Sequence, residues 1–380
     1  MKRKIFQLIL VSIFFLIICQ PSSIGQVIGK KFNDQKEVWT TPNVSQGETG
    51  LCALFSDISF LESELHRLGG GDFELSTMFV AYYFYVEKAL RRIRLRGKVD
   101  FGFHGGFNYD AFEMIRKYGI VPRSEYTGLQ KGQTEHQHNG FIKEMNSYMD
   151  YVGYNGKNGN LRSFWKEGTF HSNWLDSLKF ILNENLGTPP LKIKAGGDRL
   201  TPIQFSEKKL SIPFNDYYKF TSYSYIGFEK KGELLASGNW LHKQDFYNIR
   251  LDEYMNLIDY ALENGFSLTG DFHITVEMYN GKGYIDFQID SLNSEISQNI
   301  RDNLYENWKT NDVHNVQIIG IAYDADGNKY YKIKDSAATN EMFTNPPKYF
   351  SENFFRAKVL AVMLHKDGIP LEVRRRFKID

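Results

Sequence analysis

Cys52 is the residue of this sequence whose chemistry first needs an explanation. It stands in "NVSQGETGLCALF" (43–55), where a polar run containing glycine passes into an apolar segment. A cysteine in such a place is either a small buried apolar group or a nucleophile. A cysteine nucleophile needs a base, a residue that orients the base, and donors for the oxyanion. We therefore look for those partners elsewhere in the chain.

The other cysteine, Cys19, lies in a predicted export signal, residues 1–25. The signal opens with the basic "MKRK", continues with about fifteen apolar residues, and ends in the small-residue stretch "SIG". We expect an exported protein, periplasmic or secreted; a lipid anchor at Cys19 is less favoured because the preceding Ile18 is large. Cleavage would leave Cys52 without an intramolecular disulfide partner, which draws attention to it as a reactive thiol.

The elements that must position Cys52 begin with a helix. Residues 51–68 carry apolar side chains at intervals of three and four, and Gly69-Gly70-Gly71 ends the run. Cys52 falls in the first turn, where the helix dipole and free N–H groups favour a thiolate. Further helices are predicted from Ser76 to about Arg94 and over 108–117. We assign residues 26–129 to a helical lobe.

A mixed segment follows, over residues 130–300. Loops rich in Gly, Asn and Lys alternate there with helical stretches at 174–183 and 251–264. No other apolar run approaches the length of a membrane span, so we expect no integral span after signal removal.

The last eighty residues indicate a sheet. Val313–Tyr323 is a β-branched strand, "DADGN" is a hairpin turn, and "KYYKIK" is the return strand. A further strand is predicted over 356–364. Helices first and strands last are typical of an α+β fold, with 301–380 as its β-rich lobe.

His314 is the candidate base, because it opens that strand and the return strand leads into Asp335. Antiparallel pairing brings such residues side by side. Asp335 can accept the imidazole N–H and fix its tautomer. A lone histidine at a strand start is more often structural, but the lone Cys52 at a helix amino end reverses that preference.

Charge excludes some partners. Lys plus Arg number 46 and Asp plus Glu 45, so the formal net charge of +1 gives no electrostatic case for binding nucleic acid.

The sequence resembles the papain-like cysteine peptidases, and within them the bleomycin hydrolase and aminopeptidase C branch. Gln46, Gly50, Cys52 and the apolar "ALFSDISFL" match the family's motif around the nucleophile. Further segments that resemble the branch follow in order over about residues 40–375: "DFELSTMF", "HGGFNYDAFEMIRKYGIVPRSEY", "LGTPP", "TPIQF", "HNVQIIGI" and "FFRAKVLAVMLHKDGIPLEV".

The resemblance implies a two-lobed papain-like fold, with a helical N-terminal lobe, an antiparallel β C-terminal lobe and a large central insertion. The spacing agrees, since His314 follows Cys52 by roughly 260 residues, against roughly 130–150 in papain-type enzymes. The excess fits an insertion within 130–300.

The resemblance also implies roles. Cys52 would be the nucleophile, and His314 the general base and then the general acid. Gln46 would donate its side-chain N–H to the oxyanion beside the backbone N–H of Cys52. Gly105 and Gly106 would let the substrate backbone approach. No metal or cofactor is implied.

Two departures from the family pattern leave alternatives open. Asp335-Ser336-Ala337 stands where the family has "NSW", and Ala53 replaces an aromatic residue. We predict an exported cysteine peptidase that cleaves peptide substrates through a thioacyl-enzyme, aminopeptidase-like if it follows the branch; homo-oligomer formation is left open. The first alternative is a catalytically weakened or inactive peptide-binding homologue of the same fold. The second is an unrelated exported α+β protein in which Cys52 only packs.

Overall fold

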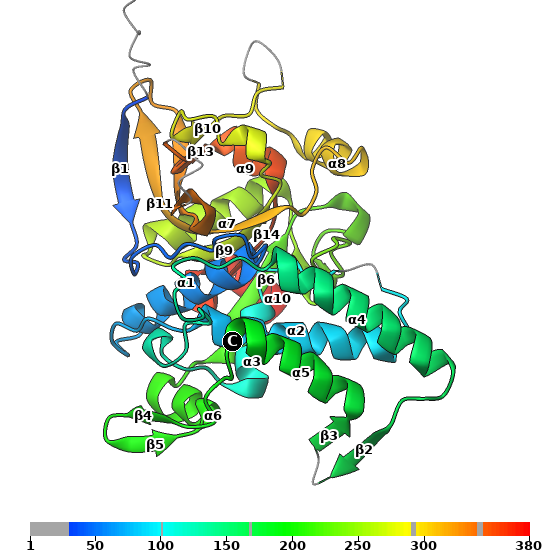
Figure 1. The fold of residues 1–380 in the computed structure, drawn as a ribbon. Coiled ribbons are helices and arrows are strands. Elements are labelled where there is room, and N and C mark those ends of the chain that lie inside the picture. Colours follow the sequence, from blue (N-terminus) through cyan, green and yellow to red (C-terminus); the bar gives the residue numbers. More distant parts are fainter. Residues whose placement is uncertain (1–29, 100–101, 167–168, 290–293, 340–344) are drawn as a thin grey trace, which may run out of the picture.

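The computed structural model describes residues 30–99, 102–166, 169–289, 294–339 and 345–380 (Figure 1). The predicted export signal, with Cys19, lies outside these residues. Within the described part of the chain, no helix is long and apolar enough to cross a membrane.

Helices dominate the first half of the chain and strands the second. The α-helices are α1 Cys52–Arg67, α2 Thr77–Arg94, α3 Asp110–Tyr118, α4 Asn139–Lys157, α5 Asn173–Leu186, α6 Pro202–Phe205, α7 Leu251–Glu263, α8 Gln298–Glu306, α9 Glu352–Lys358 and α10 Leu371–Phe377. The predicted α+β fold class is confirmed.

One mixed, mainly antiparallel sheet of ten strands forms the upper part of Figure 1. Its strands are β1 Phe32–Glu37, β6 Tyr217–Thr221, β7 Lys230–Gly232, β8 Phe246–Asn248, β9 Leu268–Phe272, β10 Tyr284–Ile285, β11 His314–Asp324, β12 Lys329–Lys334, β13 Tyr349–Ser351 and β14 Val359–His365. Their order is β10-β13-β12-β11-β9-β14-β6-β8-β7, and β1 pairs with β11. Two separate hairpins are β2 Ser163–Lys166 with β3 Thr169–Ser172, and β4 Ile193–Ala195 with β5 Asp198–Leu200.

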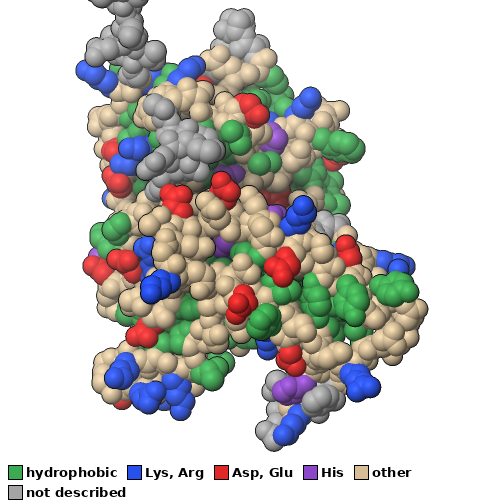
Figure 2. All heavy atoms as spheres, viewed as in Figure 1, with side chains coloured by type: hydrophobic (Ala, Val, Ile, Leu, Met, Phe, Trp, Pro, Cys, Tyr) green, Lys and Arg blue, Asp and Glu red, His purple; other side chains and the backbone are tan. Residues whose placement is uncertain are grey.

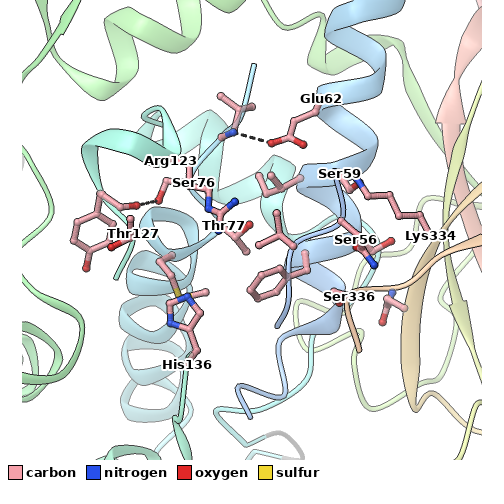
Figure 3. Close-up of a pocket in the computed structure, with 18 residues that line it drawn as sticks. Ser56, Ser59, Glu62, Ser76, Thr77, Arg123, Thr127, His136, Lys334 and Ser336 are labelled. Atoms are coloured by element: carbon pink, nitrogen blue, oxygen red, sulfur yellow. Dashed lines mark hydrogen bonds between the residues drawn. The ribbon is translucent and has the colours of Figure 1, made fainter. Parts of the chain in front are cut away.

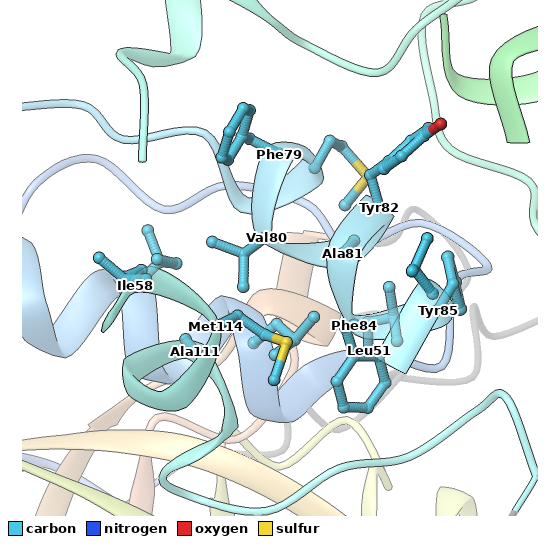
Figure 4. Packing of buried hydrophobic residues seen from close by; sticks show 14 of the residues in the cluster. Leu51, Ile58, Phe79, Val80, Ala81, Tyr82, Phe84, Tyr85, Ala111 and Met114 are labelled. Atoms are coloured by element: carbon cyan, nitrogen blue, oxygen red, sulfur yellow. The ribbon is translucent and has the colours of Figure 1, made fainter. Parts of the chain in front are cut away.

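The core has two parts. In the helical part, α1, α2 and α3 bury the apolar faces that their sequence periodicity predicts, with Ile58, Val80 and Met114 meeting between them (Figure 4). In the sheet part, α7, α9 and α10 pack with strands of the large sheet. Burial of apolar side chains stabilises each of the two parts, and the helices and strands in them hold their polar side chains in place.

Most predicted elements are confirmed within a residue or two, including α1, α2, α7 and the β11–β12 hairpin. The prediction of a strand over 356–364 is wrong at its start. Ser351 caps α9 by accepting a hydrogen bond from the Phe354 backbone N–H, so residues 356–358 are helical and β14 begins at Val359.

Strands of the large sheet come from all three of the predicted segments. β6, β8 and β9 lie within the segment predicted as an insertion, and β1 lies within the predicted helical lobe. The boundaries at 129 and 300 therefore do not separate helix from strand, and as domain limits they stay predictions.

Hydrophobic side chains gather on the surface over α4 and α5 (Figure 2). Tyr151, Tyr154 and Phe180 of these helices are more than half exposed.

Candidate active site

A tight turn fixes the entry into α1. Gly50 has φ +64°, and a Cβ there would lie 2.6 Å from Nδ1 of His104. Its carbonyl accepts a 2.8 Å hydrogen bond from the Gly105 backbone N–H. Because only glycine fits this close approach, the turn holds Cys52, the first residue of α1, at the free amino end of the helix.

Polar side chains tie α1 to the sheet behind it. Ser56 and Thr269 share a 2.8 Å hydrogen bond between their hydroxyls, joining α1 to β9. Gln317 of β11 accepts from Ser59 at 2.7 Å and donates to Ser63 at 2.9 Å. Buried, satisfied hydrogen bonds of this kind fix one relative position, so α1 and β11 carry Cys52 and His314 in register.

His314 and Asp335 form a buried pair. His314 opens β11, Asp335 directly follows β12, and the antiparallel pairing of these strands brings the two together. Nε2 of His314 lies 2.8 Å from Oδ1 of Asp335. The same carboxylate accepts the Ala337 backbone N–H at 2.8 Å.

Electrostatics favours the charged form of both partners. Burial by itself would lower the pKa of His314, but the charge of Asp335, together with the Cys52 thiol and hydrogen bonds to both groups, raises it well above its usual value. Burial would raise the pKa of Asp335, yet His314 and further hydrogen bonds hold it below its usual value. The pair is thus an imidazolium beside a carboxylate at neutral pH.

Cys52 lies against this pair. Its side chain is 7% exposed, so it is shielded from solvent while still lining a cleft. Since Nε2 of His314 is engaged by Asp335, Nδ1 is the nitrogen left for the thiol. On its other side, Sγ lies 3.9 Å from Oδ1 of Asn315. This arrangement can support a thiolate–imidazolium pair.

Tyr279 is a functional candidate that the sequence analysis missed. Its hydroxyl donates a 2.5 Å hydrogen bond to Oδ2 of Asp335. Its ring meets the His314 ring edge-on, with 6.4 Å between centroids. Tyr279 therefore covers the His314–Asp335 hydrogen bond, a task for which Ala337 is too small. No sequence signal marks it, because it follows a single 3₁₀ turn, Val276–Met278, in an irregular segment.

Gln46 lies against the residue after Asp335. Its Oε1 accepts a 2.7 Å hydrogen bond from the Ser336 hydroxyl, and its backbone N–H donates to the Ser336 carbonyl at 3.2 Å. Asn43 adds a 2.6 Å hydrogen bond to the Asp335 carbonyl. With Oε1 engaged, the side-chain NH₂ is the end that can donate to a substrate; the oxyanion role of Gln46 stays a prediction.

A cleft of about 260 Å³ opens beside Cys52. Gly105 and Gly106 line it, and their role in binding substrate stays a prediction. A Cβ at Gly106 would lie 2.9 Å from Oδ2 of Asp110, so a side chain there would disturb the wall. Residues that the sequence analysis did not single out complete the lining: Lys88, Gly102, His104, Ser237, Gly238, Asp312, Val313 and Asn315.

A second, narrower cavity lies further along α1, where Ser56, Ser59 and Glu62 line it (Figure 3). Its volume of about 40 Å³ suits one or two water molecules and no peptide. Glu62 and Lys334 enter it from α1 and β12, and His136 faces them from across the pocket. Neither Cys52 nor His314 lines this cavity, so we place no chemistry there.

No group of three or more His, Cys, Asp or Glu side chains that could hold a metal ion occurs among the residues described.

The chain is similar to known proteins in structure. No protein-family model and no curated protein matches the sequence. Among solved structures, PepW from Lactobacillus rhamnosis matches 91% of this chain and 84% of its own, with TM-score 0.65 and 18% identity. Two further structures are less similar. The bromelain protease from Ananas comosus has 12% identity and a TM-score of 0.36, and the match covers 85% of this chain and 92% of that one. Procathepsin L 3 of Tenebrio molitor has 14% identity and a TM-score of 0.35, and the match covers 87% of this chain and 69% of that one. The chain has the fold of the papain-like cysteine proteases, as its resemblance to that family predicted.

Proposed function

We propose that this protein is a cysteine peptidase in which Cys52, His314 and Asp335 act together. The observation that carries the proposal is the His314–Asp335 pair. It is buried, joined by a 2.8 Å hydrogen bond and held with a raised imidazole pKa beside the thiol of Cys52. A histidine that only packed would lose its proton on burial, since burial disfavours the charged form.

The reaction follows from these positions. The Cys52 thiolate attacks the peptide carbonyl carbon, and the carbonyl oxygen becomes an oxyanion. The Cys52 backbone N–H, at the positive end of α1, and the Gln46 side chain donate to that oxygen. The His314 imidazolium gives its proton to the departing amine as the C–N bond breaks, leaving a thioacyl-enzyme. Neutral His314 then takes a proton from water, which attacks the thioester and releases the acid and the thiol.

Asp335 holds the imidazole in the required tautomer by accepting the Nε2 proton. Tyr279 and the Ala337 backbone N–H hold the carboxylate in turn. In the family motif "NSW" a tryptophan stands where this chain has Ala337. The His314–Asp335 hydrogen bond is nevertheless formed and is covered by Tyr279, which argues against the weakened or inactive homologue.

We further propose that the protein is exported and that it belongs to the bleomycin hydrolase and aminopeptidase C branch. Export rests on the amino-terminal segment alone, and it predicts that the mature protein recovered from the periplasm or medium begins after Gly25. Membership of the bleomycin hydrolase and aminopeptidase C branch rests on the ordered motifs, and it predicts faster cleavage of peptides with a free amino terminus than of acetylated ones.

A peptide-library digest with the wild type and Cys52→Ala tests the activity. We expect the variant to lose about 10³-fold or more in kcat/KM, since the nucleophile is removed. An epoxide inhibitor of papain-type enzymes should label Cys52 near neutral pH. Ser147→Ala, which removes an exposed hydroxyl of α4 that bonds only to the Lys143 carbonyl of its own helix, is the matched control. A folded wild type that neither cleaves nor is labelled would refute the peptidase proposal.

A further inference from the structure

Asp312 is a cleft residue with an unused carboxylate oxygen. It lies two residues before His314 and lines the cleft that contains Cys52. Its Oδ2 accepts a 2.6 Å hydrogen bond from the Gly238 backbone N–H. Oδ1 has no hydrogen-bond partner among the described residues, which also provide no salt bridge to Asp312. Asp312 is half-buried and lines the cleft, so Oδ1 is the oxygen left for a ligand.

Lys88 lines the same cleft, and its ammonium group binds backbone carbonyl groups of the cleft wall. It is 2% exposed and donates to the carbonyls of His104 at 2.9 Å and Gly105 at 3.2 Å. Burial lowers the pKa of Lys88 to about 8, and the nearby carboxylates of Asp110 and Asp312 oppose that change. Lys88 therefore faces two acids, Asp110 and Asp312, and one cation cannot neutralise both while both are ionised.

Asp312 carries a negative charge at neutral pH. Burial raises its pKa to about 6, while the Gly238 N–H and Lys88 limit the rise. A partly desolvated carboxylate with one oxygen open to a cleft is a strong acceptor for an ammonium or guanidinium group, because charge-assisted hydrogen bonds gain strength where water is excluded.

We propose, on the basis of the peptidase function above, that Asp312 makes this cleft a subsite for a cationic group of the peptide. The cleft's volume of about 260 Å³ lies just below the roughly 300–1,000 Å³ of small-ligand pockets, which suits one side chain or one chain terminus. The cation is an ammonium or guanidinium, supplied either by a Lys or Arg side chain or by the free amino terminus of the substrate.

The test compares substrates that differ only in charge. In one arm, acetylated peptides carry Arg or its neutral isostere citrulline at each position around the scissile bond. In the other arm, peptides without basic residues carry a free or an acetylated amino terminus. We expect the wild type to favour the cationic member of one pair by roughly ten- to a hundredfold in kcat/KM, which is the range for a hydrogen bond to a charged group. The arm that shows the preference identifies the source of the cation.

Asp312→Asn should bring that ratio close to one, because Asn can still accept the Gly238 N–H but has no charge. Asp198→Asn, in the β5 strand away from the cleft, is the matched control and should keep the ratio. Wild-type enzyme that cleaves peptides with equal efficiency in both arms would overturn the Asp312 proposal while leaving the peptidase function intact. Wild-type enzyme that cleaves nothing would instead refute the peptidase function. If Asp312→Asn does not fold, the ratio of kcat/KM between cationic and neutral peptides in the wild type still tests whether the cleft prefers a cation.

Discussion

Asp335 and Asp271 are two carboxylates on the same sheet, both fully or almost fully buried, whose ionisation goes in opposite directions. Burial would raise the pKa of either group. His314 overcomes it at Asp335, whose pKa falls below the usual value. At Asp271 the charge of Asp312 adds to burial, and the pKa rises well above the usual value despite a hydrogen bond from Asn315. Partner charge, and not depth, distinguishes the His314–Asp335 pair from the polar layer behind α1.

The two regions differ in what their polar groups do. At the His314–Asp335 pair, a charge is stabilised so that a proton can be held and released. Behind α1, neutral carboxyl, hydroxyl and amide groups fix the distance between Cys52 and the sheet. Substitutions that change charge should therefore act on activity in the first region and mainly on stability in the second.

Among changes to these two carboxylates, the largest effect is expected at Asp335, the partner of the His314 imidazolium. Asp335→Ala should lower kcat/KM by about a hundredfold or more, since His314 loses both its orientation and its counter-charge. Asp335→Asn is the matched variant: it keeps a hydrogen-bond acceptor, so activity at neutral pH should fall by about tenfold or less.

The pH profile separates these contributions. Because Asp335 raises the pKa of His314, the Asn variant should lose its imidazolium at lower pH, and the alkaline limb of kcat/KM should move toward neutrality. An unchanged alkaline limb would show that the carboxylate charge does not act on the imidazole.

A smaller effect is expected from Tyr279→Phe, which removes only the hydroxyl on Asp335. Hydrogen bonds to charged groups contribute about 1.5–3 kcal/mol, so the free energy of unfolding at pH 7 should fall by about that amount. A carboxylate with a lowered pKa adds stability above its unfolded pKa of about 3.9, and that stability is lost as pH falls further. The deficit of the variant should therefore be full at neutral pH and shrink in strong acid.

Tyr82→Phe is the control for that measurement. Its hydroxyl donates to the uncharged amide of Asn183 at 2.9 Å, so its loss should cost about 0.5–1.5 kcal/mol with no change between neutral and acidic pH. Denaturant unfolding of both variants across pH gives the comparison. Equal pH dependence in the two would contradict a specific role of Tyr279 at Asp335.

Sequence patterns predicted the elements that carry the site but not everything that completes it. The periodicity of α1 and the alternation of β11 and β12 placed Cys52 at a helix end and His314 opposite Asp335. Those signals are local, and each depends on one element's own buried face.

What the sequence could not predict depends on contacts between distant segments. Tyr279 and Asp312 reach the site from irregular segments with no period, so only the assembled fold shows their partners. β1 was missed because "FNDQKE" is polar, yet it pairs with β11, where Lys332 of the neighbouring strand binds Asp34 and Glu37. Alternation along β11 is a further signal in the sequence: it places Asn315 and Gln317 on one face, where Asn315 contacts Cys52 and Gln317 contacts Ser59.

The smallest and most discriminating effect is expected from Asp271→Asn. A carboxyl group whose pKa is raised on folding is stabilising while protonated, and that stability is lost as pH rises above its unfolded pKa of about 3.9. A neutral amide avoids this loss and can still accept the hydrogen bond from Asn315 through its carbonyl oxygen. The variant should thus gain about 1 kcal/mol over the wild type at pH 7, and the gain should vanish near pH ~3.

The same substitution at Asp335 should have the opposite sign, because there it removes a charge that His314 stabilises. Urea unfolding of Asp271→Asn and Asp335→Asn at neutral and acidic pH measures both. If Asp271→Asn destabilised the protein at pH 7 as much as Asp335→Asn, the carboxylate behind α1 would be ionised and paired. Partner charge would then no longer explain why the two buried carboxyl groups ionise in opposite directions.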